Sequence, residues 1–142
     1  MKKVNDILSQ RKRDTITVRP DTHVIEALKI MQDQNIGSVV VMEGNQYLGI
    51  MTERDYARKV ILLGKSSIDA SVKEIMSTDL PHINRDTTLE MCMIIVSEKN
   101  IRYLPVLENG HFVGIISVND LITATIQDHL DTIEHLKNYI QM

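Results

Sequence analysis

The heptapeptide GIMTERD occupies residues 49–55, and GIISVND occupies residues 114–120. In both stretches a Gly-Ile pair ends an apolar run, and a hydroxyl-bearing residue is followed three positions later by aspartate. Such a pair is typical of a capping box, in which the hydroxyl and the carboxylate each accept a hydrogen bond from a backbone N–H at the start of a helix. Each stretch therefore predicts a strand that runs directly into a helix. Their recurrence at a spacing of 65 residues indicates an internal duplication.

The duplication extends well beyond these heptapeptides. Residues 16–56 align with residues 81–121 at the same spacing without a gap. The identical pairs in this alignment are Asp21/Asp86, Thr22/Thr87, Asn35/Asn100, Ile36/Ile101, Val41/Val106, Gly49/Gly114, Ile50/Ile115 and Asp55/Asp120. We therefore divide the chain into a first repeat, residues 1–65, and a second repeat, residues 66–142.

Each repeat predicts an amphipathic helix near its beginning. Apolar residues recur there at the i, i+3, i+4, i+7 spacing of a buried helical stripe. The two stripes are Val24, Ala27, Leu28, Met31 and Leu89, Cys92, Met93, Val96. The dipeptides Asp21-Thr22 and Asp86-Thr87 are the candidate N-caps. Cys92 is accordingly predicted to be a small buried hydrophobe.

A hairpin and a second helix follow in each repeat. Apolar runs at 39–41 and 104–107 predict one strand of each hairpin, and turn-forming residues then separate it from the heptapeptide strand. The second helices are expected to begin near Glu53 and Val118. With a first strand ahead of the amphipathic helix, each repeat is predicted to fold as β-α-β-β-α, and the fold class is α+β.

Short apolar pieces also lie ahead of both repeats and at the end of the chain. Lead-in segments at 4–8 and 72–76 have helical spacing. A longer stripe runs through residues 121–142, with members Ile126, Leu130, Ile133, Leu136 and Ile140. This stripe is too long to be covered by one small unit, so we expect part of it to pack on a partner chain.

Bulk properties exclude several classes of protein. The chain has 142 residues, a formal net charge of -3 and one cysteine, which argues against a nonspecific nucleic-acid binder and excludes a Cys-x-x-Cys zinc site. The histidines show no metal-binding spacing, so no metal site is predicted. No apolar run is long enough to cross a bilayer, and no signal-peptide pattern follows the first residues, so we expect a cytoplasmic protein. Phosphate-loop, Rossmann and nucleophile-elbow motifs are absent, and no catalytic residue is predicted.

A duplicated unit of this size with Gly-Ile-x-Thr/Ser-x-x-Asp after each hairpin resembles the cystathionine β-synthase (CBS) domain pair, or Bateman module. The stretch TERDYARKV at residues 52–60 is similar to small bacterial two-repeat members. The resemblance implies an α/β-type sandwich in which two repeats pack by pseudo-twofold symmetry and leave two clefts for adenosyl ligands. It implies a non-catalytic homodimer that regulates a target protein. AMP is the leading ligand, with ADP, ATP, NADH and S-adenosylmethionine as alternatives.

The heptapeptides carry chemistry that suits such a ligand. A carboxylate accepts two hydrogen bonds at once, so Asp55 and Asp120 can each engage the vicinal hydroxyls of a ribose. Thr52 and Ser117 lie where a helix begins, which favours a phosphate. The same four residues also have a purely structural interpretation as capping boxes, and the two roles are compatible.

The resemblance also implies which residues line each cleft. The cleft at Asp120 would use Ser117, Asn119 and Arg102, with adenine against Ile16, Ile36 and Ile115; the cleft at Asp55 would use Thr52 and Arg54, with adenine against Pro81, Ile101 and Ile50. Each isoleucine has plain core packing as its alternative. Gly37 stands at the position of Arg102 in the first repeat, so only one of the two clefts is expected to grip a phosphate tightly.

Three interpretations of function remain open at this point. The first is a non-catalytic sensor of adenine nucleotides. The second is a structural interaction module whose capping boxes are only caps and whose final helix dimerises. The third is a nucleotide-processing enzyme that uses Asp55 and Arg54. A basic run at residues 11–13 is either solvated or contacts an anion.

Overall fold

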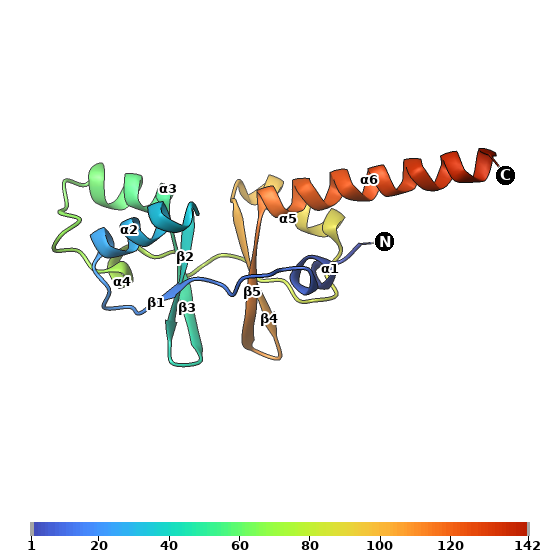
Figure 1. Ribbon diagram of the computed structural model, residues 1–142. Coiled ribbons are helices and arrows are strands. Elements are labelled where there is room, and N and C mark those ends of the chain that lie inside the picture. Colours follow the sequence, from blue (N-terminus) through green and yellow to red (C-terminus); the bar gives the residue numbers. More distant parts are fainter. Residues whose placement is uncertain (1, 142) are drawn as a thin grey trace. The chain divides into compact units, whose positions relative to one another are not determined.

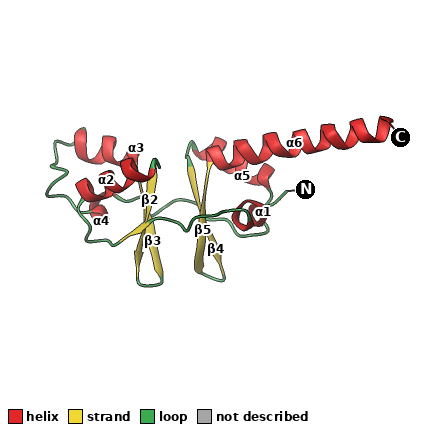
Figure 2. Ribbon diagram, in the orientation of Figure 1, coloured by secondary structure: helices red, strands yellow, loops and turns green. Residues whose placement is uncertain are grey.

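The computed structural model describes residues 2–141 and divides into two compact units. The Asp55 unit comprises residues 14–80, and the Asp120 unit comprises residues 1–13 together with residues 81–142. Each unit has its own hydrophobic core. In each, the helices cover one face of a small sheet (Figures 1 and 2).

The Asp55 unit contains a three-stranded sheet in the order β1-β2-β3. β1 (Thr17–Val18) pairs parallel with β2 (Ser38–Glu43), and β2 pairs antiparallel with β3 (Gln46–Thr52). The helices are α2 (Val24–Gln34), α3 (Glu53–Tyr56) and α4 (Val72–Ile75), and a π-helical turn, Ala57–Ile61, continues α3. This order matches the predicted β-α-β-β-α repeat.

The Asp120 unit contains the antiparallel hairpin of β4 (Tyr103–Glu108) and β5 (His111–Ser117). Its helices are α1 (Val4–Ser9), α5 (Leu89–Lys99) and α6 (Val118–Gln141). The hairpin closes on Asn109 and Gly110, which both have positive φ angles of 52° and 81°. Positive φ at both positions is the requirement of a tight type I′ turn, for which Asn-Gly is the preferred dipeptide.

The first strand of the second repeat is reduced to a single bridge between Ile83 and Val106. In the first repeat, the backbone N–H of Val40 donates to the carbonyl of Ile16 and extends the pairing of β1 with β2. The residue at the position of Val40 in the second repeat is Pro105, which has no N–H to donate. The predicted strand therefore cannot extend in the same way.

The ends of the amphipathic helices follow the duplication more closely than their beginnings. α2 and α5 both end on an asparagine in the left-handed region, Asn35 with φ 54° and Asn100 with φ 53°, which is a common helix C-terminus. The predicted N-caps were wrong: Thr88 caps α5 by accepting from the backbone of Met91, and α2 begins after His23, whose side chain makes no capping bond. The residue immediately before each helix determines whether a side chain caps it, and this residue differs between the repeats: His23 before α2 and Thr88 before α5.

The two lead-in helices do not stay with the repeats that follow them in the sequence. α1 precedes the first repeat, but Val4 is fully buried in the core of the Asp120 unit. α4 precedes the second strand-helix set, but Val72 and Ile75 are buried in the core of the Asp55 unit. The compact units therefore differ from the division at residue 65, which describes the sequence repeat.

This exchange explains why glycine recurs in both heptapeptides. A Cβ at Gly49 would lie 2.6 Å from the carbonyl oxygen of Ser77, just after α4. A Cβ at Gly114 would lie 2.8 Å from a methyl carbon of Leu8 in α1. At Gly49 the lead-in backbone therefore lies too close to the last strand for a side chain, whereas at Gly114 the contact is with the end of a flexible side chain.

Candidate functional site

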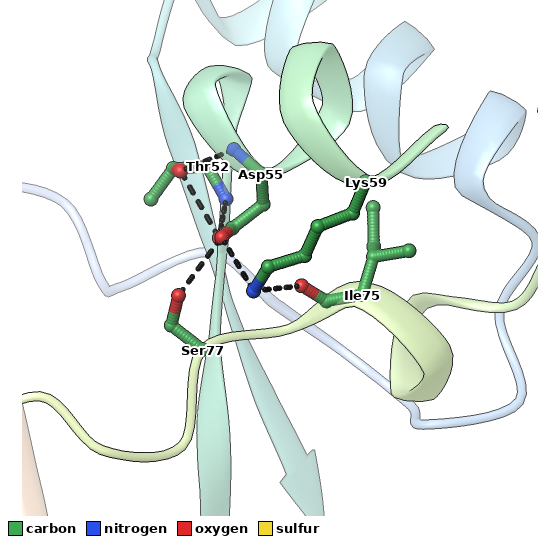
Figure 3. A network of polar contacts seen from close by, with 5 residues as sticks. All are labelled: Thr52, Asp55, Lys59, Ile75 and Ser77. Atoms are coloured by element: carbon green, nitrogen blue, oxygen red, sulfur yellow. Dashed lines mark hydrogen bonds and ion pairs between the residues drawn. The ribbon is translucent and has the colours of Figure 1, made fainter. Parts of the chain in front are cut away.

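Asp55 lies at the centre of a polar network inside its unit (Figure 3). Its Oδ2 accepts from the backbone N–H and the hydroxyl of Thr52, both at 3.0 Å, and the Thr52 hydroxyl in turn accepts from the Asp55 backbone N–H. Its Oδ1 accepts from the hydroxyl of Ser77 at 2.8 Å and from the ammonium of Lys59 at 3.0 Å. The predicted capping box is therefore formed, and it is extended by two further donors.

These contacts leave Asp55 no free acceptor site. A carboxylate offers about four lone-pair positions, and four donors from Thr52, Ser77 and Lys59 surround this one. Its side chain is only 7% exposed. Lys59 also donates to the carbonyl of Ile75, so the ammonium ties the π-helical turn to α4. A ligand that engaged Asp55 would have to displace one of these donors.

Asp120 forms the equivalent capping box but has a different environment. Its Oδ2 accepts from the backbone N–H of Ser117 at 2.8 Å, while the Ser117 hydroxyl accepts from the Asp120 backbone N–H. The guanidinium of Arg11 reaches the same Oδ2 at 2.6 Å. Within the part of the chain that the structure describes, Oδ1 accepts no hydrogen bond. The side chain as a whole is 34% exposed, compared with 7% for Asp55.

The cation beside each carboxylate comes from a different element. Lys59 lies one helical turn after Asp55, and the aligned position in the second repeat is Ala124. Arg11, on the segment after α1, supplies the positive charge at Asp120 instead. Neither Lys59 nor Ser77 was predicted as a site residue. The i, i+4 spacing of Asp55 and Lys59 was the available signal, because residues one turn apart on a helix are neighbours.

An open hollow borders Asp120 on the surface of its unit. It measures about 340 Å³ and lies between α1 and the first turns of α6. Its lining residues are Lys2, Asp6, Ile7, Gln10, Arg11, Asp120, Thr123, Ala124 and Gln127. The lining therefore combines two cations and two carboxylates with amide, hydroxyl and apolar side chains.

The other predicted site residues are divided between the units. The Asp55 unit holds Ile16, Ile36, Ile50 and Arg54, and the Asp120 unit holds Pro81, Ile101, Arg102, Ile115 and Asn119. Arg102 and Asn119 are exposed, whereas Arg54 is half-buried. Ile50 is fully buried, which favours core packing as its role; the other predicted apolar contacts are half-buried. The grouping of these residues into two clefts stays a prediction.

Cys92 is buried in the core of the Asp120 unit, as predicted. Burial raises the pKa of its thiol to about 11, so the thiol is not a nucleophile at neutral pH. Among residues 2–141, the acidic, histidine and cysteine side chains form no group of three that could hold a metal ion. No helix in the same range is both long and apolar enough to span a bilayer.

The CBS domain model matches residues 4–61 and again residues 72–126. The chain belongs to the CBS domain family. Two CBS repeats in tandem, each with small sheets and covering helices, confirm the predicted mixed α/β fold class. Packing of the two CBS repeats by pseudo-twofold symmetry stays a prediction.

Relatives of the CBS chain include proteins of plants, bacteria and archaea. It is 33% identical over 126 residues to the CBS domain-containing protein CBSX3, mitochondrial, of Arabidopsis thaliana, covering 85% of this chain and 61% of CBSX3. A putative signal-transduction protein with CBS domains from Burkholderia ambifaria has a solved structure with a TM-score of 0.84 and 37% identity, over 89% of this chain and 96% of that one. The CBS domain pair of protein MJ0100, solved with 5′-methylthioadenosine and S-adenosyl-L-methionine, has a TM-score of 0.76 and 25% identity, over 90% and 98% of the two chains.

Proposed function

We propose that this CBS pair is a non-catalytic regulatory module that binds an adenosyl ligand, and that Asp120 is its principal ribose acceptor. AMP is the leading candidate ligand; ADP, ATP, NADH and S-adenosylmethionine are the alternatives. The observation that carries the proposal is the free Oδ1 of Asp120, which lies beside a cation at the edge of an open hollow.

The comparison of the two carboxylates supports this assignment. A ribose hydroxyl can donate to Oδ1 of Asp120 without breaking any bond that the carboxylate makes with Ser117 or Arg11. At Asp55 the same hydroxyl would have to replace Ser77 or Lys59. The binding energy at Asp55 is therefore reduced by the energy of the displaced contact, and we expect this site to be weaker.

The Asp120 unit also holds groups that suit a phosphate. The hydroxyl of Ser117 accepts from the backbone and keeps its own hydrogen for another acceptor, whereas the hydroxyl of Thr52 donates its hydrogen to Asp55. Arg11 makes one short contact with Asp120 and has other guanidinium hydrogens, so it can bridge the carboxylate and a phosphate. Arg102, which has no counterpart at Gly37, lies in the same unit and is proposed as a second phosphate contact.

The chemistry of ligands in the MJ0100 CBS pair is consistent with this proposal. Both 5′-methylthioadenosine and S-adenosyl-L-methionine carry an adenosine with free 2′ and 3′ hydroxyls. A ligand regulates only if it binds one conformation better than another. Because Arg11 lies on the segment between α1 and β1, a ligand that redirects its guanidinium would change how that segment is held.

Isothermal titration calorimetry with AMP, ATP, NADH and S-adenosylmethionine tests the proposal. We expect binding of at least one of them, and a loss of about tenfold or more in affinity for Asp120→Asn, which keeps an acceptor for the cap but removes the charge. Asp55→Asn is the matched control and should change affinity less. A 2′-deoxy analogue of the bound ligand should also bind more weakly.

No heat and no thermal shift with any of the four ligands would refute ligand binding and favour the structural module. A larger effect of Asp55→Asn than of Asp120→Asn would refute the assignment of the principal site. Chromatography of the ligand after incubation separates the sensor from an enzyme, because a sensor leaves the ligand intact.

A further inference from the structure

The two carboxylates share a capping box but differ in what surrounds the second oxygen. At Asp55, the ammonium of Lys59 lies 3.0 Å from Oδ1 and the hydroxyl of Ser77 lies 2.8 Å from it (Figure 3). At Asp120, Oδ1 accepts no hydrogen bond from residues 2–141. A carboxylate oxygen has room for about two donors. Side chains of the Asp55 unit therefore fill the acceptor positions that the hydroxyls of a ribose would need.

Lys59 is held by a second acceptor as well. Its ammonium donates to the carbonyl of Ile75 at 3.0 Å, so a ligand that displaces Lys59 must break two contacts. The lysine side chain is 41% exposed, whereas that of Asp55 is 7% exposed. A lysine has a flexible stem and a strongly hydrated ammonium. Lys59 can therefore move into water, while the carboxylate stays fixed by its cap.

The backbone that carries Lys59 is a π-helical turn, Ala57–Ile61. The backbone N–H of Leu62 donates to the carbonyl of Ala57 at 3.1 Å, and Val60 within this turn is fully buried. The aligned residues 122–126 of the second repeat lie in the regular α-helix α6. π-helical turns are rare and occur frequently at functional sites. The two repeats thus differ in backbone as well as in sequence at the position of Lys59.

The second repeat has no lysine at the aligned position. The residue there is Ala124, one helical turn after Asp120. Ala124 and Asp120 both line the hollow of about 340 Å³ between α1 and α6. Arg11, the cation at Asp120, contacts Oδ2 and not Oδ1. The Asp120 unit therefore has open space beside its carboxylate on the turn where the Asp55 unit carries a lysine.

We infer that Lys59 closes the Asp55 site to an adenosyl ligand, and that alanine at position 124 leaves the Asp120 site open. The inference rests on the proposed function, because it names the residue that sets the preference between the two carboxylates. Lys59 acts through Asp55: a ribose hydroxyl reaches Oδ1 only after the ammonium has left, so part of the binding energy is lost in displacing it. Lys59 is thus a specificity-determining residue that touches Asp55 rather than the ligand.

Calorimetry with AMP on the full chain tests this role. The parent variant is Asp120→Asn, which weakens the other site, so that the heat reports on Asp55. In this parent, Lys59→Met keeps the apolar stem without the ammonium and should raise the AMP affinity by about tenfold. Lys59→Arg keeps a cation and should bind like the parent. Lys73→Met removes a charge from an exposed position of α4 and should also bind like the parent.

The sign of this effect separates it from a structural role. Removal of a positive charge ordinarily weakens the binding of an anion such as AMP. A tighter complex after Lys59→Met therefore reports the release of Asp55, which neither a loss of stability nor a change of net charge would produce.

The reciprocal substitution tests the same idea at the other carboxylate. Ala124→Lys places an ammonium one helical turn after Asp120 and should lower the AMP affinity of the otherwise wild-type chain by about tenfold. Ala124→Met adds a stem without charge and should lower it less, so this control separates the ammonium from simple filling of the hollow. Thermal melts without ligand show whether each variant is folded.

The outcomes distinguish a failure of this inference from a failure of the proposed function. Unchanged AMP affinity for both Lys59→Met and Ala124→Lys, in proteins whose affinity still falls on Asp120→Asn, would overturn the role of Lys59 alone. Equal gains from Lys59→Met and Lys73→Met would overturn it too, since they would assign the effect to net charge. Binding of no adenosyl ligand by the wild type and by Lys59→Met would overturn both.

Discussion

Replacement of Asp55 and Asp120 by alanine should have very different effects on stability, although both residues occupy the same position of a capping box. Asp55→Ala removes the cap of α3, which contributes about 1 kcal/mol. It also removes the acceptor of Ser77 and the charge partner of Lys59 inside a site where the carboxylate is 7% exposed. A hydrogen bond to a charged group contributes about 1.5–3 kcal/mol.

The exposure of each partner limits these contributions. Lys59 is 41% exposed, so its ammonium can regain water and the loss of the ion pair costs less than it would in a dry core. Ser77 is half-buried, and its hydroxyl loses the carboxylate to which it donates. Together these effects predict a loss of about 3 kcal/mol in the free energy of unfolding for Asp55→Ala.

Asp120→Ala should cost about 1 kcal/mol. It loses the cap at the start of α6, but the contact with Arg11 joins side chains that are 26% and 34% exposed, and such ion pairs contribute between about 0 and 1 kcal/mol. The core contacts of α6, such as the buried Leu121, are unchanged, so the helix should persist.

Urea denaturation followed by circular dichroism measures both variants against the wild type. A double-mutant cycle of Asp55→Ala with Ser77→Ala should show a coupling of about 1 kcal/mol or more, because the two side chains share one hydrogen bond. Equal destabilisation by Asp55→Ala and Asp120→Ala would refute the reasoning, since the argument depends on the difference in burial and in the number of donors.

Three further perturbations have defined outcomes. Gly49→Ala should lower the free energy of unfolding by about 2–3 kcal/mol, because its Cβ would lie 2.6 Å from the backbone oxygen of Ser77. Gly114→Ala should cost less, because its Cβ would meet the end of the flexible Leu8 side chain, and thermal melts of both variants distinguish the two cases. Burial holds the pKa of the Cys92 thiol at about 11, so a thiol-reactive disulfide reagent at pH 8 should label it only in denaturant, and rapid labelling of the folded protein would contradict the packed core. Burial raises the pKa of Tyr47 from 10.0 to about 12, so the unfolded chain loses this proton first and stability should fall as the pH rises through that interval; a flat stability profile there would argue against burial of the phenol.

The asymmetry of the two carboxylates has a functional consequence. Asp55 is buried among donors from its own unit, so it is the less accessible acceptor. Asp120 has a free oxygen, and its cation, Arg11, comes from a segment distant in the sequence. The absence of a basic residue at Gly37 indicates the same preference from the sequence alone. Two independent features therefore favour Asp120 over Asp55 as the principal site.

Local patterns in the sequence predicted much of this protein. Hydrophobic periodicity located α2 and α5, the turn residues located both hairpins, and the duplicated heptapeptides located two capping boxes that are formed as expected. These features depend on residues within about four positions of one another, so the chain encodes them locally. The same kind of pattern within residues 121–142 predicted an apolar stripe that one small unit would not cover.

Tertiary structure alone decided which distant groups meet. Arg11 and Asp120 are 109 positions apart, and Ser77 is 22 positions from Asp55, so no periodicity connects them. The lead-in helix α1 packs in the core of the Asp120 unit, and α4 packs in the core of the Asp55 unit. Which core each helix fills depends on the shape of that core, because protein interiors are closely packed. The two similar heptapeptides therefore differ in chemistry. The surrounding donors determine which oxygens of each carboxylate can accept a ligand, and some of these donors, Ser77 and Arg11, come from distant parts of the chain.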